Sequence, residues 1–410
     1  MPSAISPTHP TSTPAPEPSR RWTRLGLDDG GPGRTHLSYE MLRELGQRCG
    51  GRRVSVAMPT HLRGPQTQQD PVRLSGLLRQ VEAELAEELG ASRAVRLLRP
   101  AHELADDASF WKHCDRGLVL LLDTRGLAAF KVPRPLQPVA WVGERFRTTP
   151  LLPLVEPDRF RVLAVSQHDV TLLEGDRRGL EPLPQGDLPR ALEDVVGHDL
   201  ERGSLQFHTG GPGGRAVFHG QGEGNDDHDH ERIEFLRRVT DVVKRRLGTS
   251  TEPLVLAAVE RTVADLRRLG AGLPLTPDAV LGNPGDLGLS ELHAAAWTCA
   301  EPELRRPANE LRARIDERLG TPLASIDLRE ILHAARWGRV DALVVAGDEP
   351  QWGTCDTTCE HIELHEAHQR GDFDLVDLTV AHALAYGADV FMAPAGALPE
   401  DARVGAVFRF

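Results

Sequence analysis

Short apolar runs of strand length alternate with amphipathic stripes of helical spacing along most of this chain. Residues 54–59, 117–123 and 340–346 are apolar runs bounded by proline, glycine or charged residues, as buried strands are. The stripe that follows the first run consists of Leu74, Leu77, Leu78, Val81, Leu85 and Leu89. This alternation predicts α/β layers throughout, because amphipathic helices bury their apolar stripe against a sheet.

The same patterns predict the remaining elements. Further strands are expected at 127–132, 160–165, 170–173, 253–259, 388–392 and 405–410. Helices are expected at 290–318, 326–337 and 375–386, with a long one whose stripe holds Ile233, Leu236, Val239, Val243 and Leu247. Helices after Asp70-Pro71 and before Gly270 complete the set.

Proline-rich and glycine-rich stretches divide the chain. Six prolines among serine and threonine in the first twenty residues predict a disordered N-terminal tail over 1–24. Three consecutive α/β domains follow at 25–155, 156–285 and 286–410.

Composition excludes several classes of protein. No apolar run approaches the roughly 18 to 20 residues of a membrane span, and the start lacks a secretory signal. The 5 cysteines are odd in number and scattered, which argues against a disulfide scaffold. We therefore expect a cytoplasmic protein with no membrane partner.

Charge is distributed unevenly. Residues 1–155 hold 21 Lys and Arg against 16 Asp and Glu, a net of +5, whereas 156–410 hold 27 against 44, a net of −17. Such asymmetry is typical of chains in which one part meets a polyanion. Ordinary surface variation explains the same numbers equally well.

The segment 206–231 carries the most information, with seven glycines between Gly210 and Gly224. It lacks the Gly-Lys-Ser/Thr end of a phosphate-binding loop and the spacing of a dinucleotide fingerprint. The run 226–231, which includes His228, Asp229 and His230, has ligand types that suit a metal. Residues two apart do not share a helix face, and acidic residues are common where helices start.

The string 218–224, Phe-His-Gly-Gln-Gly-Glu-Gly before a basic amphipathic helix, resembles the peptide-release loop of archaeal and eukaryotic class-1 release factors. Residues 253–259 and 328–345 resemble further units of that family, and 54–73 is similar to its bacterial branch. The resemblance to this release factor and Pelota superfamily implies an RNase H-like middle domain and a ribosomal-protein-like last domain.

The loop departs from the family pattern at its end. Aligning His219 and Gly220 places Gln221, Gly222, Glu223 and Gly224 where the family has Arg, Gly, Gly and Gln. The resemblance implies that the family glutamine positions water on the peptidyl-tRNA ester, so Gln221 and Glu223 are the remaining catalytic candidates. Members without the glutamine, such as Pelota, act on stalled ribosomes without hydrolysing the ester, and this chain is closer to them.

The resemblance also implies the partners: the ribosome, through rRNA and peptidyl-tRNA, and a translational GTPase, with no cofactor and no DNA. Basic or imidazole side chains near the first strand and the glycine-rich segment are the RNA-binding candidates. They are Arg52, Arg53, His61, Arg63, Arg73, Arg215, Arg237, Arg238 and Lys244.

Cys355, Cys359, His361 and His365 superficially resemble a zinc set. Structural zinc sites normally have tighter paired knuckles, so a surface loop with incidental thiols is the favoured interpretation and no metal site is favoured.

Three hypotheses of function follow. The first is a ribosome-associated translation factor in rescue, hibernation or peptidyl-tRNA hydrolysis. The second is a metal-dependent hydrolase that uses 226–231. The third is a non-catalytic interaction protein on the same fold, which the negative charge of 156–410 favours because RNA binding normally needs a basic face.

Overall fold

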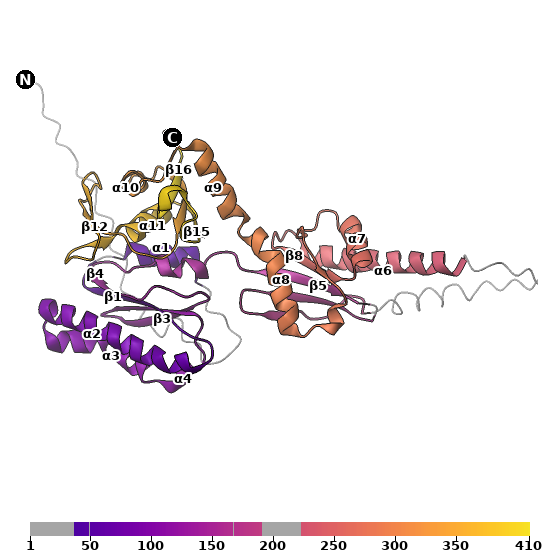
Figure 1. Cartoon of the computed structure of the whole chain (residues 1–410), viewed down its shortest axis with the longest axis horizontal. Coiled ribbons are helices and arrows are strands. Elements are labelled where there is room, and N and C mark those ends of the chain that lie inside the picture. Colours follow the sequence, from indigo (N-terminus) through magenta and orange to yellow (C-terminus); the bar gives the residue numbers. More distant parts are fainter. Residues whose placement is uncertain (1–36, 49, 167, 191–222) are drawn as a thin grey trace, which may run out of the picture. The chain divides into compact units, whose positions relative to one another are not determined.

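The computed structural model describes residues 37–48, 50–166, 168–190 and 223–410. The chain forms two compact units, each assembled from two segments of sequence. Unit 1 comprises Met1–Leu154 and Asp348–Ala381, and unit 2 comprises Val155–Gly347 and His382–Phe410. Both mix helices and sheets (Figure 1), which confirms the predicted α/β class. No described helix is long and apolar enough to cross a bilayer.

The larger sheet of unit 1 is antiparallel, in the order β3-β2-β1-β4. Its strands are β1 (Arg53–Pro59), β2 (Gly117–Asp123), β3 (Gly126–Val132) and β4 (Val139–Gly143). The helical elements of this segment are α1 (Tyr39–Gln47), η1 (Pro65–Gln69), α2 (Asp70–Leu89), α3 (Ala91–Ala105), α4 (Ala108–Trp111) and η2 (Thr149–Leu154). Leu74, Leu78 and Leu85 of α2 are fully buried in one core with Val54 and Val56 of β1. The predicted helical stripe is therefore confirmed.

The second segment of unit 1 forms a small sheet in the order β13-β12-β14, of which the sequence predicts only the strand at 362–364. Its strands are β12 (Trp352–Cys355), β13 (Ile362–Leu364) and β14 (Phe373–Asp374). Helix α11 (Leu375–Ala385) follows directly. Strands of two to four residues hold too few side chains to show a period of two, so β12 and β14 were not predicted.

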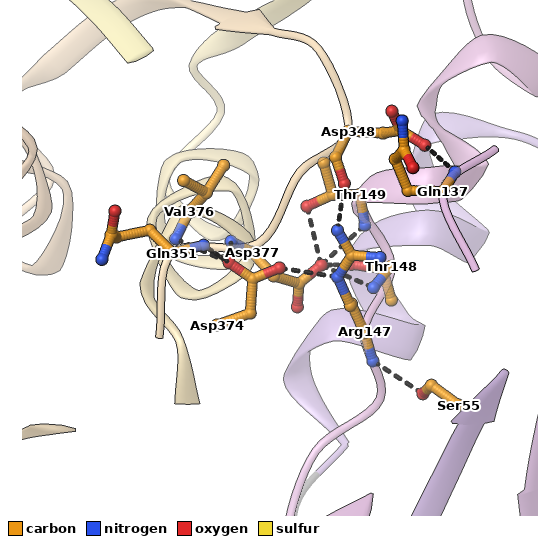
Figure 2. Close-up of polar contacts among 10 residues, drawn as sticks. All are labelled: Ser55, Gln137, Arg147, Thr148, Thr149, Asp348, Gln351, Asp374, Val376 and Asp377. Carbon is orange, nitrogen blue, oxygen red and sulfur yellow. Dashed lines mark hydrogen bonds and ion pairs between the residues drawn. The ribbon is translucent and has the colours of Figure 1, made fainter. Parts of the chain in front are cut away.

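A buried ion pair joins the two segments of unit 1, as Figure 2 shows. Arg147 Nε lies 2.6 Å from Asp374 Oδ2, and both side chains are 2% exposed. Arg147 Nη2 also donates to the carbonyl of Asp348, and the Arg147 amide donates to Ser55 Oγ at 2.9 Å. Since a buried charge is tolerated only when it is paired and hydrogen-bonded, these contacts specify how the segments assemble.

Asp377 of α11 makes a second buried link (Figure 2). Its Oδ1 accepts hydrogen bonds from the amides of Thr148 at 2.5 Å and Thr149 at 2.6 Å, and from Thr149 Oγ1 at 2.8 Å. Burial raises the pKa of this carboxyl, the nearby Asp374 raises it further, and the hydrogen bonds from Thr149 oppose the shift. Asp377 thus binds the amides that begin η2 at the cost of an unfavourable buried charge.

The first sheet of unit 2 is mixed, in the order β7-β6-β5-β8-β9. Strands β5 (Phe160–Val165), β6 (Val170–Gly175) and β7 (Leu180–Pro182) form an antiparallel meander, while β8 (Leu254–Ala258) and β9 (Val280–Leu281) continue it in parallel. This order agrees with the RNase H-like sheet that the resemblance implies. The predicted strands at 160–165, 170–173 and 253–259 are confirmed to within two residues.

Helices cover both faces of this sheet. Helices α6 (Glu223–Leu247) and α7 (Glu260–Leu269) pack against Leu163, Leu254 and Leu256. Helix α8 (Leu289–Leu304) packs against the opposite face, with Val162 and Val255. Successive strand residues point to opposite faces, so the continuous apolar runs fill both cores at once.

The second sheet of unit 2 has the order β10-β16-β11-β15, in which β11 is parallel to β15 and antiparallel to β16. Its strands are β10 (Ala324–Ser325), β11 (Val340–Ala346), β15 (Asp389–Ala393) and β16 (Val404–Phe408), with helices α9 (Arg306–Arg318) and α10 (Leu328–Arg336) and the turns η3 (Pro284–Asp286) and η4 (Pro399–Asp401). The helix predicted over 290–318 is two helices, α8 and α9. Arg305 ends α8, and Pro307, which lacks a backbone N–H, lies in the first turn of α9.

The compact units do not follow the boundaries expected from the sequence. Residues 348–381 join the first segment, although the sequence placed them in the last domain. Helix α8 contributes Leu292, Ala296 and Ala300 to a core of the middle sheet, although it begins after the expected boundary at 285. The three-domain division stays a prediction, and the predicted tail over 1–24 lies outside the described residues.

Candidate functional site

Helix α6 begins earlier than the glycine-rich segment was expected to end. The sequence predicted a loop over 206–231, but residues 223–231 are helical. The acidic residues in this part of the sequence favour an early helix start, because acidic residues complement the positive end of the helix dipole. Glu223 and Gly224 therefore belong to the first turn of α6. Arg215, His219, Gly220, Gln221 and Gly222 lie outside the described residues.

The apolar face of α6 anchors it to the middle sheet. Leu236, Val239, Val243 and Leu247 are buried as predicted, whereas Ile233 is half-buried. Phe235 and Val242, which the predicted stripe omitted, are also in the core. The apolar face is therefore wider than the predicted stripe, and α6 is held along its second half.

The basic side chains of α6 make local contacts. Arg237 and Arg238 both pair with Glu234, and Arg237 remains 55% exposed. Lys244 donates to the carbonyl of Leu269 at 3.1 Å, where it caps the end of α7. Of these three RNA-binding candidates, Arg237 is the most accessible to a phosphate, and Lys244 has a structural role.

Within the His and Asp run, the side chains that the structure describes are those of 229–231, and they form no metal site. Asp229 pairs with Arg232 at 3.8 Å and with Arg261. The described residues contain no cluster of three or more His, Cys, Asp or Glu side chains that could hold a metal ion. The hydrolase hypothesis thus gains no support from Asp229, whose carboxylate faces arginines.

His61 and Arg73, two further RNA-binding candidates, converge on one buried carboxylate. Asp70, at the start of α2, accepts from the His61 amide at 2.9 Å, from His61 Nδ1 at 2.9 Å and from Arg73 Nη1 at 3.0 Å. The Asp70 side chain is 2% exposed and the His61 side chain 28%. A carboxylate on Nδ1 fixes the imidazole tautomer and leaves Nε2 as the available atom.

The remaining candidates near β1 have different surroundings. Arg53 is buried, donates to the carbonyls of Gly50 at 2.7 Å and Glu144 at 2.9 Å, and therefore cannot reach a nucleic acid. Arg52 pairs with Glu88, while Arg63 is exposed in the turn after the strand. Because β1 is antiparallel to both neighbours, this end of the sheet is not the carboxyl edge of parallel strands at which α/β folds commonly bind phosphate.

The Cys and His set does not converge. The sulfur atoms of Cys355 and Cys359 are 3.8 Å apart, but His361 pairs with Asp356 at 3.1 Å and His365 with Asp372 at 2.8 Å. The hydrogen bond between the thiols and their burial raise the pKa of Cys355, so this thiol resists the ionisation that metal binding requires.

Two features of the site were not predicted from the sequence. The sequence indicated only that Asp70 starts a helix, whereas in the structure Asp70 orients His61. The only local sign of this pair is an Asp nine residues after a His. Arg147 and its carboxylate partner Asp374 are 227 positions apart, and no local pattern links them.

One known protein family matches part of this chain. Residues 160–302 match the sequence model of the bacterial archaeo-eukaryotic release factor family 7. The matched segment runs from the first residue of β5 into the last turn of α8 and contains the glycine-rich segment and α6. A search of curated proteins found no match.

Several solved structures are similar to this chain over 91% of its length. The archaeal translation termination factor aRF1 shares 17% identity over 99% of its own chain, with a TM-score of 0.22. Pelota of Archaeoglobus fulgidus shares 11% over 92%, with a TM-score of 0.30, and a ribosome-bound archaeal Pelota, from a model with ABCE1, shares 11% over 94%, with a TM-score of 0.37. The superfamily predicted from the sequence is the one whose bacterial family model matches residues 160–302 of this chain.

Proposed function

We propose that this chain is a ribosome-associated translation factor that acts on stalled ribosomes and does not hydrolyse the peptidyl-tRNA ester. The observation that carries the proposal is the family match over 160–302, which spans the middle sheet and α6. The proposed partners are rRNA, peptidyl-tRNA and a translational GTPase.

The packing of α6 supports a presenting role for this helix. Its second half is fixed to the sheet by buried residues such as Leu236 and Val243, so α6 is a rigid base for the residues that precede Glu223. On the exposed side, Arg237 offers a guanidinium to a phosphate. The proposed contact with the ribosome therefore combines the glycine-rich segment with the exposed face of α6.

The absence of ester hydrolysis follows from the chemistry at position 224. Peptide release needs a donor positioned on the oxygen where negative charge develops. Gly224 stands where the family has glutamine and has no side-chain amide to donate, and it belongs to the first turn of α6. Glu223 is a carboxylate, which would repel the developing charge.

The His61 region supports a second RNA contact in unit 1. Asp70 holds the imidazole through Nδ1, and exposed Arg63 lies two residues away. A phosphate would receive an ion pair from Arg63, and the imidazole Nε2 would accept a hydrogen bond from a ribose 2′-hydroxyl.

Ribosome cosedimentation tests the function. We expect the full chain to pellet with stalled ribosomes, and a variant in which 210–222 is replaced by a Gly/Ser linker of equal length to remain in the supernatant. This replacement leaves all described residues of α6 in place. Arg93→Ala, a change at an exposed arginine of α3, is the matched control and should pellet normally. A full chain that never pellets would contradict the proposal and favour the non-catalytic interaction protein.

A peptidyl-tRNA hydrolysis assay on the same ribosomes tests the chemistry. We expect no release above background for the wild type, Gln221→Ala and Glu223→Ala. Release by the wild type that either substitution abolishes would show that the ester is hydrolysed after all. Metal analysis of the pure protein addresses the hydrolase hypothesis, which requires bound metal.

A further inference from the structure

Aromatic and arginine side chains gather where three segments of the second unit 2 sheet meet. The turn after α10, the residues after α11 and the end of β16 supply them. We call this set the aromatic–arginine patch; it consists of Arg336, Trp337, Arg339, Tyr386, Arg409 and Phe410.

Hydrogen bonds hold the three segments together. Arg409 Nη1 donates to the Gly338 carbonyl at 3.2 Å, and its Nη2 donates to the Tyr386 carbonyl at 3.0 Å. The Arg409 amide donates to the Arg339 carbonyl at 2.8 Å. Gly338 has a φ of +70°, and a Cβ there would lie 3.0 Å from the Tyr386 ring, so the ring rests on the glycine. The patch is therefore a defined surface built around Arg409.

The aromatic rings of the patch are exposed although each is large. Trp337 is 56% exposed, Tyr386 48% and Phe410 73%. Arginine side chains lie beside two of them: the Arg336 guanidinium is 5.9 Å from the Trp337 ring centroid, and that of Arg339 is 5.9 Å from the Phe410 ring. Flat exposed rings next to guanidinium groups offer stacking surfaces and positive charge in one place.

The local charge contrasts with that of the surrounding sequence. The segments 336–339, 386–388 and 408–410 hold three arginines and no Asp or Glu, whereas 156–410 holds 27 Lys and Arg against 44 Asp and Glu. Two acidic residues lie just beyond these segments: Asp341, which pairs with Arg314 at 3.4 Å, and the exposed Asp389. Arginines therefore outnumber acidic residues at the patch, in contrast to 156–410 as a whole.

We propose that the aromatic–arginine patch binds single-stranded or looped-out RNA. An unpaired base would stack on Trp337 or Tyr386, and the neighbouring phosphates would bind the arginines. Apolar surface alone would suit a protein partner as well, but guanidinium groups beside exposed aromatic rings favour a polyanion that carries flat bases. The proposal rests on the proposed function only for the source of the RNA, which is the ribosome.

Fluorescence anisotropy with a labelled single-stranded oligoribonucleotide tests the patch in the full chain. We expect Trp337→Leu, which keeps apolar bulk but removes the aromatic face, to weaken binding roughly 5- to 100-fold. Trp337→Phe, which keeps an aromatic face, should retain most of the affinity. Arg339→Ala should weaken binding and lower the slope of log K against log salt by about 1. Arg93→Ala on α3 is the matched charge control and should bind as the wild type.

Three results would overturn the proposal. They are no binding by the wild type, equal binding by Trp337→Leu and the wild type, and Trp337-dependent self-association in sedimentation velocity without any RNA dependence. The last result would identify a second copy of the chain as the occupant.

The same variants separate this inference from the proposed function. If the wild type pellets with ribosomes but Trp337→Leu binds the oligoribonucleotide normally, the inference fails and the function stands. If Trp337→Leu loses oligoribonucleotide binding but the wild type never pellets with ribosomes, the function fails and the inference stands.

Discussion

Two buried carboxylates show how single residues determine the assembly of unit 1. Asp374 pairs with Arg147, and its Oδ1 also accepts from the Gln351 and Val376 amides. Asp377 instead accepts amide and hydroxyl hydrogen bonds, and burial raises its pKa. The first carboxylate is therefore compensated by a cation, whereas the second is compensated by dipoles.

The raised pKa of Asp377 predicts a stability that falls as pH rises. A folded-state pKa above the unfolded one means that the native state binds more protons, so its contribution is complete below about pH 4 and is lost as pH rises through the folded pKa. Asp377→Asn removes this titration. We expect its urea midpoint, relative to wild type, to increase between about pH 4 and about pH 8. Asp316→Asn, at an exposed site of α9, should show no such trend, and a constant difference for Asp377→Asn would contradict the prediction.

Breaking the Arg147 ion pair should destabilise unit 1 strongly. Arg147→Met leaves the Asp374 carboxylate buried without its cation, which costs about 3–5 kcal/mol. Arg147→Met combined with Asp374→Asn removes both charges and keeps an acceptor for the amides at the start of α11, so we expect it to recover part of the loss. Urea unfolding of both variants measures this. Equal destabilisation by the single and double variants would show that the lost packing, not the stranded charge, is responsible.

At the scale of elements, α6 depends on packing more than on helix propensity. Its first turns contain Gly224, Asn225 and four acidic residues, Glu223, Asp226, Asp227 and Asp229, whereas its second half contributes six side chains to a core. Most helical stability in proteins comes from such packing.

Truncation of the α6 core face should therefore matter more than truncation of its exposed face. Leu236→Ala, at a site 1% exposed, should cost roughly 2–5 kcal/mol through lost burial and the cavity that it leaves. Arg237→Ala, one residue later and 55% exposed, should change stability by less than about 0.5 kcal/mol. Thermal or urea unfolding of the pair is the measurement, and similar effects would place Leu236 outside the core.

Elements of ordinary length were predictable, while most short ones were not. Strands β1, β2 and β11 and helix α10 match their predictions closely because each contains enough residues to show its period. The two-residue strands β9 and β14 form only because longer strands pair with them. The division of 289–318 into two helices was also not predicted, since the apolar pattern continues past Arg305.

At the scale of the whole chain, unit 1 is discontinuous in sequence. Its second segment, Asp348–Ala381, is reached only after most of unit 2 has been traversed. Arg147, Thr148 and Thr149 therefore receive their partners from 201 to 229 residues further along the chain.

This arrangement predicts that the first segment is weakened when it stands alone. A fragment of 37–154 leaves the Arg147 guanidinium and the Thr148 and Thr149 amides without the acceptors at 348, 374 and 377. We expect it to melt well below the corresponding transition of the full chain, and a fusion of 37–154 to 348–381 through a flexible linker to recover much of the difference. A fragment as stable as the fusion would show that the second segment contributes little.

The sequence by itself determined the α/β class, most strands and helices, the buried face of α6 and the resemblance to the release factor superfamily. These depend on neighbours a few positions apart, where side-chain period and motif order are visible. Only the tertiary structure decided that Asp70 holds His61 and Arg73, that Arg53 is buried, and that 348–381 completes unit 1. Such pairings join residues whose separation has no period, so they exist only once the chain has packed.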